Sequence, residues 1–331
     1  YVHPFFKKEV VRMDPAKVDE VFSQVVFSGD DFKATFDKQS GLLTSYIYKK
    51  QEYIHNGQGP QPFFWRAPTD NDYGAKLPTR LKAWREASYQ TPKAESFNVS
   101  KDGDKSIVKV TYRFPQVDAQ WEITYKVFAN GIIKVDNRFV AEGTETPMIP
   151  RVGLRMQLSE ILNDLTYYGR GPEENYRDRR TSQFIGEYTT PIKDLYEPYI
   201  RPQENEHRTD IYWCALTTKQ KAGLLFIADR TFELNASNYL LGSLDSGETI
   251  DNGAPRTNET NHRHLTDPQP VKQVDMFIDY RMMGVGGDNS WGAIAHEPYL
   301  IRPGVENTIE YGFSIVPFDK KADYKNLIYQ Y

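Results

Sequence analysis

Carboxylates lie close together at two points of the sequence. Glu173 and Glu174 are adjacent, and Glu204 and Glu206 alternate. Enzymes that cleave glycosidic bonds generally need a pair of carboxylates, because one side chain transfers a proton while the other acts as nucleophile or base. Adjacent or alternate glutamates in a polar loop are more often solvated charge. We therefore interpret these four glutamates as surface charge.

Two histidines could in principle bind a metal ion. His262 and His264 would share one face of an extended segment, and that spacing is compatible with metal ligation. No third ligand is evident beside them, so an ordinary hydrogen-bonded pair is the favoured interpretation. Cys214 is the only cysteine, which excludes an intrachain disulfide and a cysteine-based metal site.

Other patterns exclude several classes of function. The glycines of "YGRGP" are not followed by the Lys-Ser/Thr pair of a phosphate-binding loop, and the sequence contains no Gly-x-Ser-x-Gly nucleophile elbow. The net charge is −4 without a run of basic residues, so we expect no nucleic-acid partner. The longest apolar runs are far too short to span a bilayer, and we expect no membrane partner.

Trp291 ends a turn that does not need it. The residue follows two glycines, Gly286 and Gly287, and two polar turn formers, Asp288 and Asn289. Such turns rely on the backbone freedom of glycine and on Asp and Asn side chains that bond to nearby backbone. An indole in this position either packs into its own domain or waits for a flat apolar partner. Aromatic residues make up 14% of the chain, which favours β structure and also suits carbohydrate binding.

Alternation of apolar and polar residues with a period of two runs along most of the chain. It predicts a hairpin-like pair over 32–39 and 42–50, a hairpin over 121–140 that turns at Asn130–Gly131, and further strands over 106–114, 223–237, 271–282 and 308–318. This pattern predicts an all-β fold in the form of a large antiparallel sandwich.

Helical pattern is confined to two segments. One covers 14–22, with Asp14 as the N-cap and Pro15 in the first turn, and the other covers 78–89. The segment 167–210 is long, polar and interrupted by Pro and Gly. We expect it to be a loop that is functional or packs against a neighbour.

Four separated motifs resemble those of one family. "FFWRAPTDNDYG" (63–74) and "YYGRGPEENYRDR" (167–179) are similar to signatures of the C-terminal domain of bacterial glycoside hydrolase family 2 β-galactosidases, and "ETNHRHL" (259–265) and "GVGGDNSW" (284–291) resemble its last two signatures. The match runs from about Val25 to Phe318. It implies a β-supersandwich with galactose-mutarotase-like topology over 23–318, with 1–22 as the end of a preceding domain and 319–331 as a C-terminal extension.

The resemblance also implies where the chemistry takes place. In the family, the two catalytic glutamates and the magnesium and sodium ligands lie in a central α/β barrel, and this sequence does not contain that barrel. We therefore expect no catalytic residue, metal or cofactor in this chain, and a partner in the catalytic barrel of a longer parent protein. That parent would hydrolyse lactose-like β-galactosides by a retaining mechanism, and it could form a homo-oligomer. Its compartment, in the bacterial cytoplasm or periplasm, stays open.

The family's C-terminal domain contributes one aromatic platform to the sugar pocket. The platform position matches Trp291, which would stack on the glucose or galactoside aglycone. The segment that starts at Gly74 resembles a loop beside that pocket, although its content, "AKLPTRLKAW", departs from the family pattern.

Two other functions stay open at this stage. One is a stand-alone mutarotase-like epimerase, for which His262, His264 and a glutamate could supply the acid and the base. The other is an autonomous carbohydrate-binding module.

Overall fold

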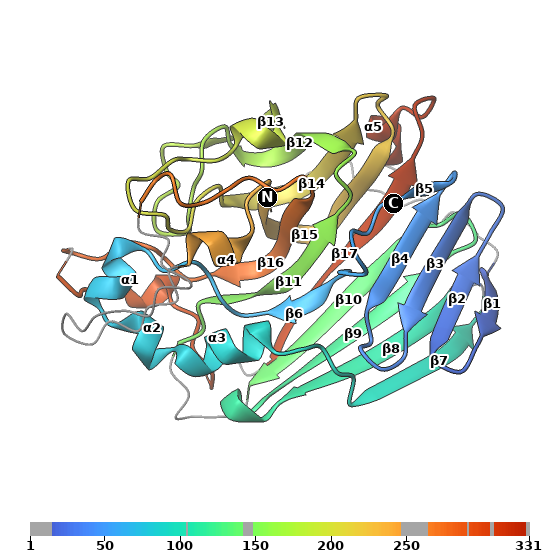
Figure 1. Cartoon of the computed structure of the whole chain (residues 1–331), viewed down its shortest axis with the longest axis horizontal. Coiled ribbons are helices and arrows are strands. Elements are labelled where there is room, and N and C mark those ends of the chain that lie inside the picture. The colour runs from blue at the N-terminus through green and yellow to red at the C-terminus, as the bar shows by residue number, and fades with distance from the viewer. Residues whose placement is uncertain are drawn as a thin grey trace.

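The computed structural model describes residues 15–103, 105–141, 148–245, 264–289, 291–304 and 308–328. Two antiparallel sheets account for most of this part of the chain (Figure 1). The smaller sheet contains, in order, β1 (Lys17–Glu20), β2 (Gln24–Ser28), β3 (Phe32–Asp37), β4 (Leu43–Tyr48) and β5 (Gln51–Glu52).

The larger sheet has twelve strands. Its main path runs through β13 (Phe184–Pro191), β12 (Leu162–Gly171), β14 (Arg208–Thr218), β15 (Gly223–Ser237), β17 (Thr308–Phe318), β10 (Ile133–Ala141), β9 (Ala119–Val127), β8 (Lys105–Phe114) and β7 (Ser96–Asp102). Off this path, β16 (Val274–Met282) pairs with β15 and with β11 (Arg151–Leu158), and β11 also pairs with β6 (Gln61–Phe63).

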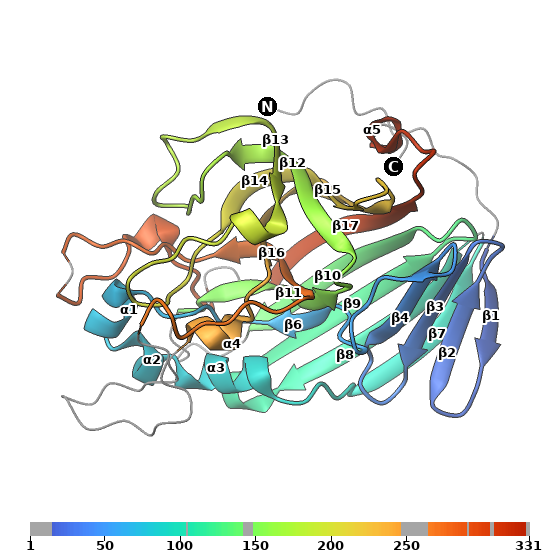
Figure 2. The same ribbon diagram turned by 45° about the horizontal axis from the view of Figure 1, so that its top comes forward.

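The helices are short. They are α1 (Asp70–Gly74), α2 (Leu77–Arg80), α3 (Lys82–Tyr89), α4 (Leu241–Leu244) and α5 (Tyr324–Leu327), with 3₁₀ turns η1 (Pro115–Val117), η2 (Ile192–Asp194) and η4 (Glu297–Tyr299). Helices α1, α2 and α3 lie at the end of the molecule away from β1 and β7 (Figures 1 and 2). Among the described residues, no helix has the length and apolar character needed to cross a membrane.

The two sheets pack face to face through aromatic side chains. Strands β1 to β4 lie over β7 to β9 in both views (Figures 1 and 2). The Phe36 ring of β3 lies 5.0 Å from the Tyr125 ring of β9, centroid to centroid, and the Tyr46 hydroxyl donates to the Gly131 carbonyl at 2.5 Å. Buried and half-buried residues alternate strictly along β9. The period of two in the sequence therefore builds the sandwich, and the expected all-β, antiparallel fold is confirmed.

The individual strand predictions are also confirmed. Strands β3 and β4 pair as expected, β9 and β10 form the hairpin that turns at Asn130–Gly131, and Gly131 has a positive φ of 90°. The helix expected over 78–89 is present as α2 and α3, which are separated at Leu81.

The helix expected over 14–22 is wrong in the part that the structure describes. Lys17–Glu20 form β1, which pairs with β2, while Asp14 lies outside the described residues. Val18 packs against the core from this strand, so pairing and burial outweigh the local N-cap signal. Strand β1 therefore lies within the segment, 1–22, that was expected to precede the domain. The domain boundaries at residues 23 and 319 stay predictions.

The segment 167–210 is less irregular than expected. It includes the end of β12, all of β13 and the start of β14. Strand β13 pairs along its length with β12, which supplies backbone hydrogen bonds that the polar composition of the segment did not predict. The stretches on either side of β13 run without strand structure, and they carry Glu174, Asp178 and Tyr199 of the site described below.

Candidate functional site

The "RAPTDND" motif forms a buried arginine–aspartate pair at the start of a helix. Thr69 caps α1, with its hydroxyl accepting from the Asp72 amide while the Asp72 carboxylate accepts from the Thr69 amide. The same carboxylate accepts two hydrogen bonds from Arg66, at 3.0 and 2.7 Å. Arg66 and Asp72 are almost fully buried, and such two-pronged, charge-assisted pairs fix geometry strongly. The motif therefore positions α1 rigidly.

Arg66 also joins α1 to the segment that leads to Trp291. Its guanidinium donates to the carbonyls of Met283 at 2.6 Å and Gly284 at 3.1 Å. The Asn71 amide donates to the Val285 carbonyl at 3.3 Å. Two motifs more than two hundred residues apart in the chain are thus held against each other by backbone recognition.

Asp178, from the "YRDR" motif, holds the same segment from the other side. Its carboxylate accepts from the backbone amides of Val285 at 3.1 Å and Gly286 at 2.7 Å. A Cβ on Gly284 would lie 2.7 Å from the Asp178 carboxyl group, so the aspartate can approach only because that residue is glycine. None of the glycines of "GVGG" has a positive φ, so they serve close packing and not the backbone freedom that the sequence suggested.

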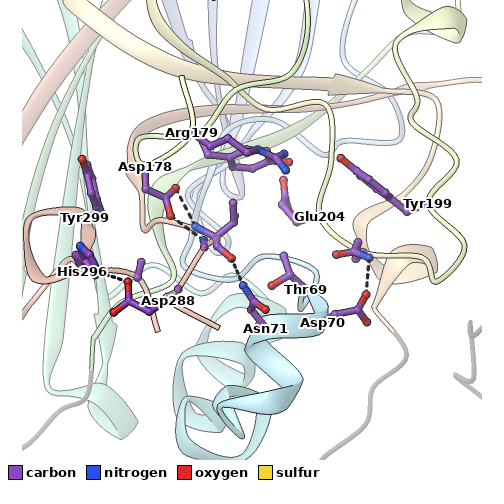
Figure 3. Close-up of a pocket in the computed structure, with 16 residues that line it drawn as sticks. Thr69, Asp70, Asn71, Asp178, Arg179, Tyr199, Glu204, Asp288, His296 and Tyr299 are labelled. Carbon is purple, nitrogen blue, oxygen red and sulfur yellow. Dashed lines mark hydrogen bonds and ion pairs between the residues drawn. The ribbon is translucent and has the colours of Figure 1, made fainter. Parts of the chain in front are cut away.

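These segments enclose a cavity of about 560 Å³. Figure 3 shows Asp178 bonded to the backbone on one side, Tyr299 and Tyr199 at opposite sides, and Asp70 and Asp288 at separate points of the wall. The lining residues are Thr69, Asp70, Asn71, Tyr176, Asp178, Arg179, Tyr199, Gln203, Glu204, Val285, Gly286, Gly287, Asp288, Ala295, His296 and Tyr299. Three of the sequence motifs thus meet at one concave site.

Trp291 lies on the same loop as the cavity wall but outside the cavity lining. The residue is 89% exposed. Its amide donates to the Asn289 side chain at 2.9 Å, which is the self-bonded turn that the sequence predicts. An indole left in water in this way is the unusual case for so large an apolar side chain, and the interpretation of Trp291 as a core residue of this domain is wrong.

Gly74 and the Trp291 loop lie in contact. Gly292 has a φ of 124°, and a Cβ there would lie 2.9 Å from the Gly74 carbonyl oxygen. Gly74 is the exposed last residue of α1. The segment after it continues into α2, whose Leu77 is buried, so the loop that the resemblance suggested is short and leads into the helix expected from residue 78. The two candidate site residues named from the sequence are therefore neighbours.

Comparison with known proteins identifies the family. The sequence model of the family described as "Beta galactosidase small chain" matches residues 28–315. The chain belongs to this family.

Relatives of this small-chain member carry the name β-galactosidase. The chain is 33% identical over 284 residues to a protein of that name from Priestia megaterium, where the alignment covers 86% of this chain and 26% of the relative. It is 30% identical over 291 residues to one from Halalkalibacterium halodurans, with coverages of 87% and 27%. The chain thus spans about a quarter of the length of these relatives.

A solved structure shares the fold of the small chain. Galactose 1-epimerase from Lactobacillus acidophilus aligns over 92% of this chain and 99% of its own, with a TM-score of 0.50 and 7% identity. At this identity the likeness shows the fold alone, and it confirms the mutarotase-like topology expected from the sequence.

Two of the four glutamates interpreted as surface charge are buried in the small chain. Glu204 and Glu206 are each 3% exposed, so the interpretation is wrong for them. Glu204 accepts from Arg151 at 3.2 Å and from Asn235 at 3.0 Å. Burial raises the pKa of Glu206 well above its usual value. Glu173 is exposed as expected.

Glu174 organises the cavity wall instead of facing open solvent. Its carboxylate accepts from Arg179 at 2.6 Å, from the Glu206 amide at 2.9 Å and from the Tyr199 hydroxyl. The side chain is 14% exposed. Glu174 thus ties together two stretches of the cavity wall that flank β13 in the sequence.

A buried ionic network lies behind Glu204, and the sequence gives no sign of it. His207 lies between Asn235, at 2.8 Å from Nδ1, and Glu233, at 3.0 Å from Nε2. Burial would lower the pKa of His207, but the hydrogen bond to Glu233 and its charge raise it overall. Burial raises the pKa of Asp279 to about 7, although Arg151 lies 3.1 Å away and opposes this shift.

This network supports the loop instead of facing the cavity. Glu233 also accepts from the Met282 amide at 2.7 Å, just before the segment that Arg66 and Asp178 hold. His207 has no exposed surface, and its ring stacks on that of Tyr176 at 5.4 Å between centroids. The network therefore supports the backbone that lies behind the cavity wall.

The histidine pair considered for metal binding gains no support. His262 lies outside the described residues. The His264 side chain is exposed, and its amide donates to Asp267 at 2.9 Å in a turn. No group of three or more His, Cys, Asp or Glu residues in the described part of the chain is arranged to hold a metal ion.

Proposed function

We propose that this chain is the sugar-platform domain of a β-galactosidase that hydrolyses terminal β-D-galactosides such as lactose with retention of configuration. The two catalytic glutamates, and the magnesium and sodium ions, would lie in a catalytic barrel outside this chain. The names of the relatives and the quarter of their length that this chain matches support this division. The chain itself would hydrolyse nothing.

The exposure of Trp291 supports the proposal most directly. The loop that carries it is anchored at its base by Arg66 and Asp178, yet Trp291 at its end is 89% exposed. A stacking platform requires an aromatic face that its own domain leaves uncovered, and an anchored backbone reduces the conformational entropy that the loop loses on binding. The aglycone sugar would cover this ring in the assembled pocket.

In the part of the chain that the structure describes, which does not include His262, the buried histidine His207 is no candidate base for the epimerase alternative. Both ring nitrogens of His207 are engaged, and the ring has no exposed surface. A general base must lie within hydrogen-bond reach of the proton that it abstracts. His207 is therefore a structural residue.

Two preparations test the proposal. The full-length protein that contains this chain should release galactose from lactose. NMR should show that the released galactose retains its anomeric configuration. The isolated chain should neither cleave a chromogenic galactoside nor accelerate mutarotation of galactose. Mutarotation by the isolated chain would favour the epimerase, and failure of the full-length protein to cleave any β-galactoside would refute the proposal.

A further inference from the structure

We propose that the cavity beneath the Trp291 loop is a further saccharide subsite, which holds the sugar beyond the one that stacks on Trp291. The preferred substrates would then include neutral β-galactosides of three or more sugar residues. This inference rests on the proposed function and extends it from a single aromatic platform to a built pocket.

The size and position of the cavity carry the inference. Its volume of about 560 Å³ lies within the range of about 300–1,000 Å³ that small-molecule sites occupy. Asp288 lines the cavity, and Trp291 follows it on the same loop. Because an extended chain advances at most about 3.6 Å per residue, their Cα atoms lie within about 11 Å of each other. A short saccharide can therefore contact Trp291 and enter the cavity.

The walls are ordered before any ligand binds. Asp178 fixes Val285 and Gly286, and Glu174 fixes Tyr199 and Arg179. A pocket whose walls are already held by hydrogen bonds loses little conformational entropy on binding. The cavity is thus a preformed site rather than a gap between mobile loops.

The charges at the cavity select a neutral ligand rich in hydroxyl groups. Asp178 and Glu204 are satisfied by backbone amides and by Arg151, and Arg179 is paired with Glu174. Two other carboxylates therefore determine the charge that a ligand meets at the wall. Asp70 accepts from Gln203 at 3.3 Å, and Asp288 lies 2.8 Å from His296.

Carboxylates form short, strong hydrogen bonds with hydroxyl donors, whereas they repel phosphate, sulfate and uronate groups. Tyr199 and Tyr299 face the cavity from opposite sides (Figure 3), and they add aromatic surface for the apolar faces of a sugar ring. Both features suit an uncharged sugar.

The test compares two substrates of the full-length protein. Lactose reaches only the platform, whereas galactosyllactose, a neutral trisaccharide, would place its third residue in the cavity. The variant Asp70→Ala removes an exposed carboxylate of the cavity wall that is not part of the Trp291 loop. Because a hydrogen bond to a charged group contributes about 1.5–3 kcal/mol, kcat/KM for galactosyllactose should fall on the order of tenfold or more. The value for lactose should change less than about twofold, within the range of surface substitutions.

Two controls sharpen the result. Asp102→Ala removes an exposed carboxylate at the end of β7, far from the cavity. It should leave kcat/KM for both substrates unchanged. Galactosyllactose oxidised to a carboxylate at its reducing end places a negative charge in the cavity. The wild-type protein should cleave this anion more slowly than the neutral trisaccharide, and Asp70→Ala should reduce that discrimination.

The outcomes separate this inference from the proposed function. Equal losses for lactose and galactosyllactose, or no loss for either, would overturn the subsite while leaving the galactosidase assignment in place. Equal cleavage of the neutral and the anionic trisaccharide by the wild-type protein would also overturn it. Absence of lactose hydrolysis by the wild-type protein would refute the proposed function itself.

Discussion

Asp178 should act on sugar binding through the loop that carries Trp291, although it lies at the base of that loop. The substitution Asp178→Asn keeps the shape of the side chain but replaces one acceptor oxygen with an NH₂ donor. Val285 and Gly286 both present backbone N–H groups to this carboxylate, at 3.1 and 2.7 Å. The amide can accept only one of them, and its NH₂ would then face the other.

The structure sets the size of the effect. A hydrogen bond to a charged group contributes about 1.5–3 kcal/mol, so the ordered loop should lose about 2 kcal/mol of its preference over displaced conformations. Because Asp178 acts through Trp291, the fall in affinity for glucose should not exceed the roughly tenfold expected when the platform itself is removed. The melting temperature should change little, because the segment lies at the surface and can open locally.

The assay is inhibition of the full-length protein by glucose, measured for Asp178→Asn, Trp291→Ala and the double variant. If Asp178 acts by positioning Trp291, the two effects are not additive, since the second substitution finds the platform already lost. Asp102→Asn is the matched control and should behave as wild type. Additive losses, or an Asp178→Asn variant that binds glucose normally, would refute this reasoning.

Two further predictions follow from the same contacts. Asp279→Asn should stabilise the protein more at pH 8 than at pH 5. Folding raises the pKa of Asp279 to about 7. The stability that the protonated carboxyl group gives the wild-type protein is therefore complete below the unfolded pKa and is lost as the pH rises toward 7. The difference between variant and wild type should grow by about 2–3 kcal/mol across that interval, measured by urea unfolding, and an equal difference at both pH values would contradict it. Gly292→Ala should weaken glucose binding without unfolding the domain, because the φ of 124° and the contact with Gly74 exclude a Cβ; Gly103→Ala, which has a positive φ but open space, is the control, and equal behaviour of the two variants would exclude a role for the contact.

The sandwich could be predicted because its cause is local. Along β9 the side chains alternate between buried and half-buried, and Asn130–Gly131 marks the turn into β10. The error at β1 arose where a local cap signal competed with pairing partners that a single sequence does not display. Val18 is held by β2 and by the core, and neither contact can be read from the residues around it.

The site could be predicted only in part, for a similar reason. Motif resemblance names Trp291 and Gly74 as candidates, and their part in sugar binding stays a prediction. The capping pattern from Thr69 to Asp72 carries a signal that locates the start of α1. The burial of Glu204 could not be foreseen, because its partners Arg151 and Asn235 come from distant strands. Polar loop composition does not distinguish solvated glutamates from those paired in the interior.

The affinity of the Trp291→Ala variant of the full-length protein for glucose tests the central claim most directly. A sugar face that covers roughly 40–60 Å² of the indole contributes about 1–1.5 kcal/mol, so binding should weaken on the order of tenfold. Galactose should lose less, and the melting temperature should stay within about 2 °C of wild type because the ring is 89% exposed. Unchanged glucose affinity together with a large fall in melting temperature would contradict the account and show that Trp291 stabilises its own domain.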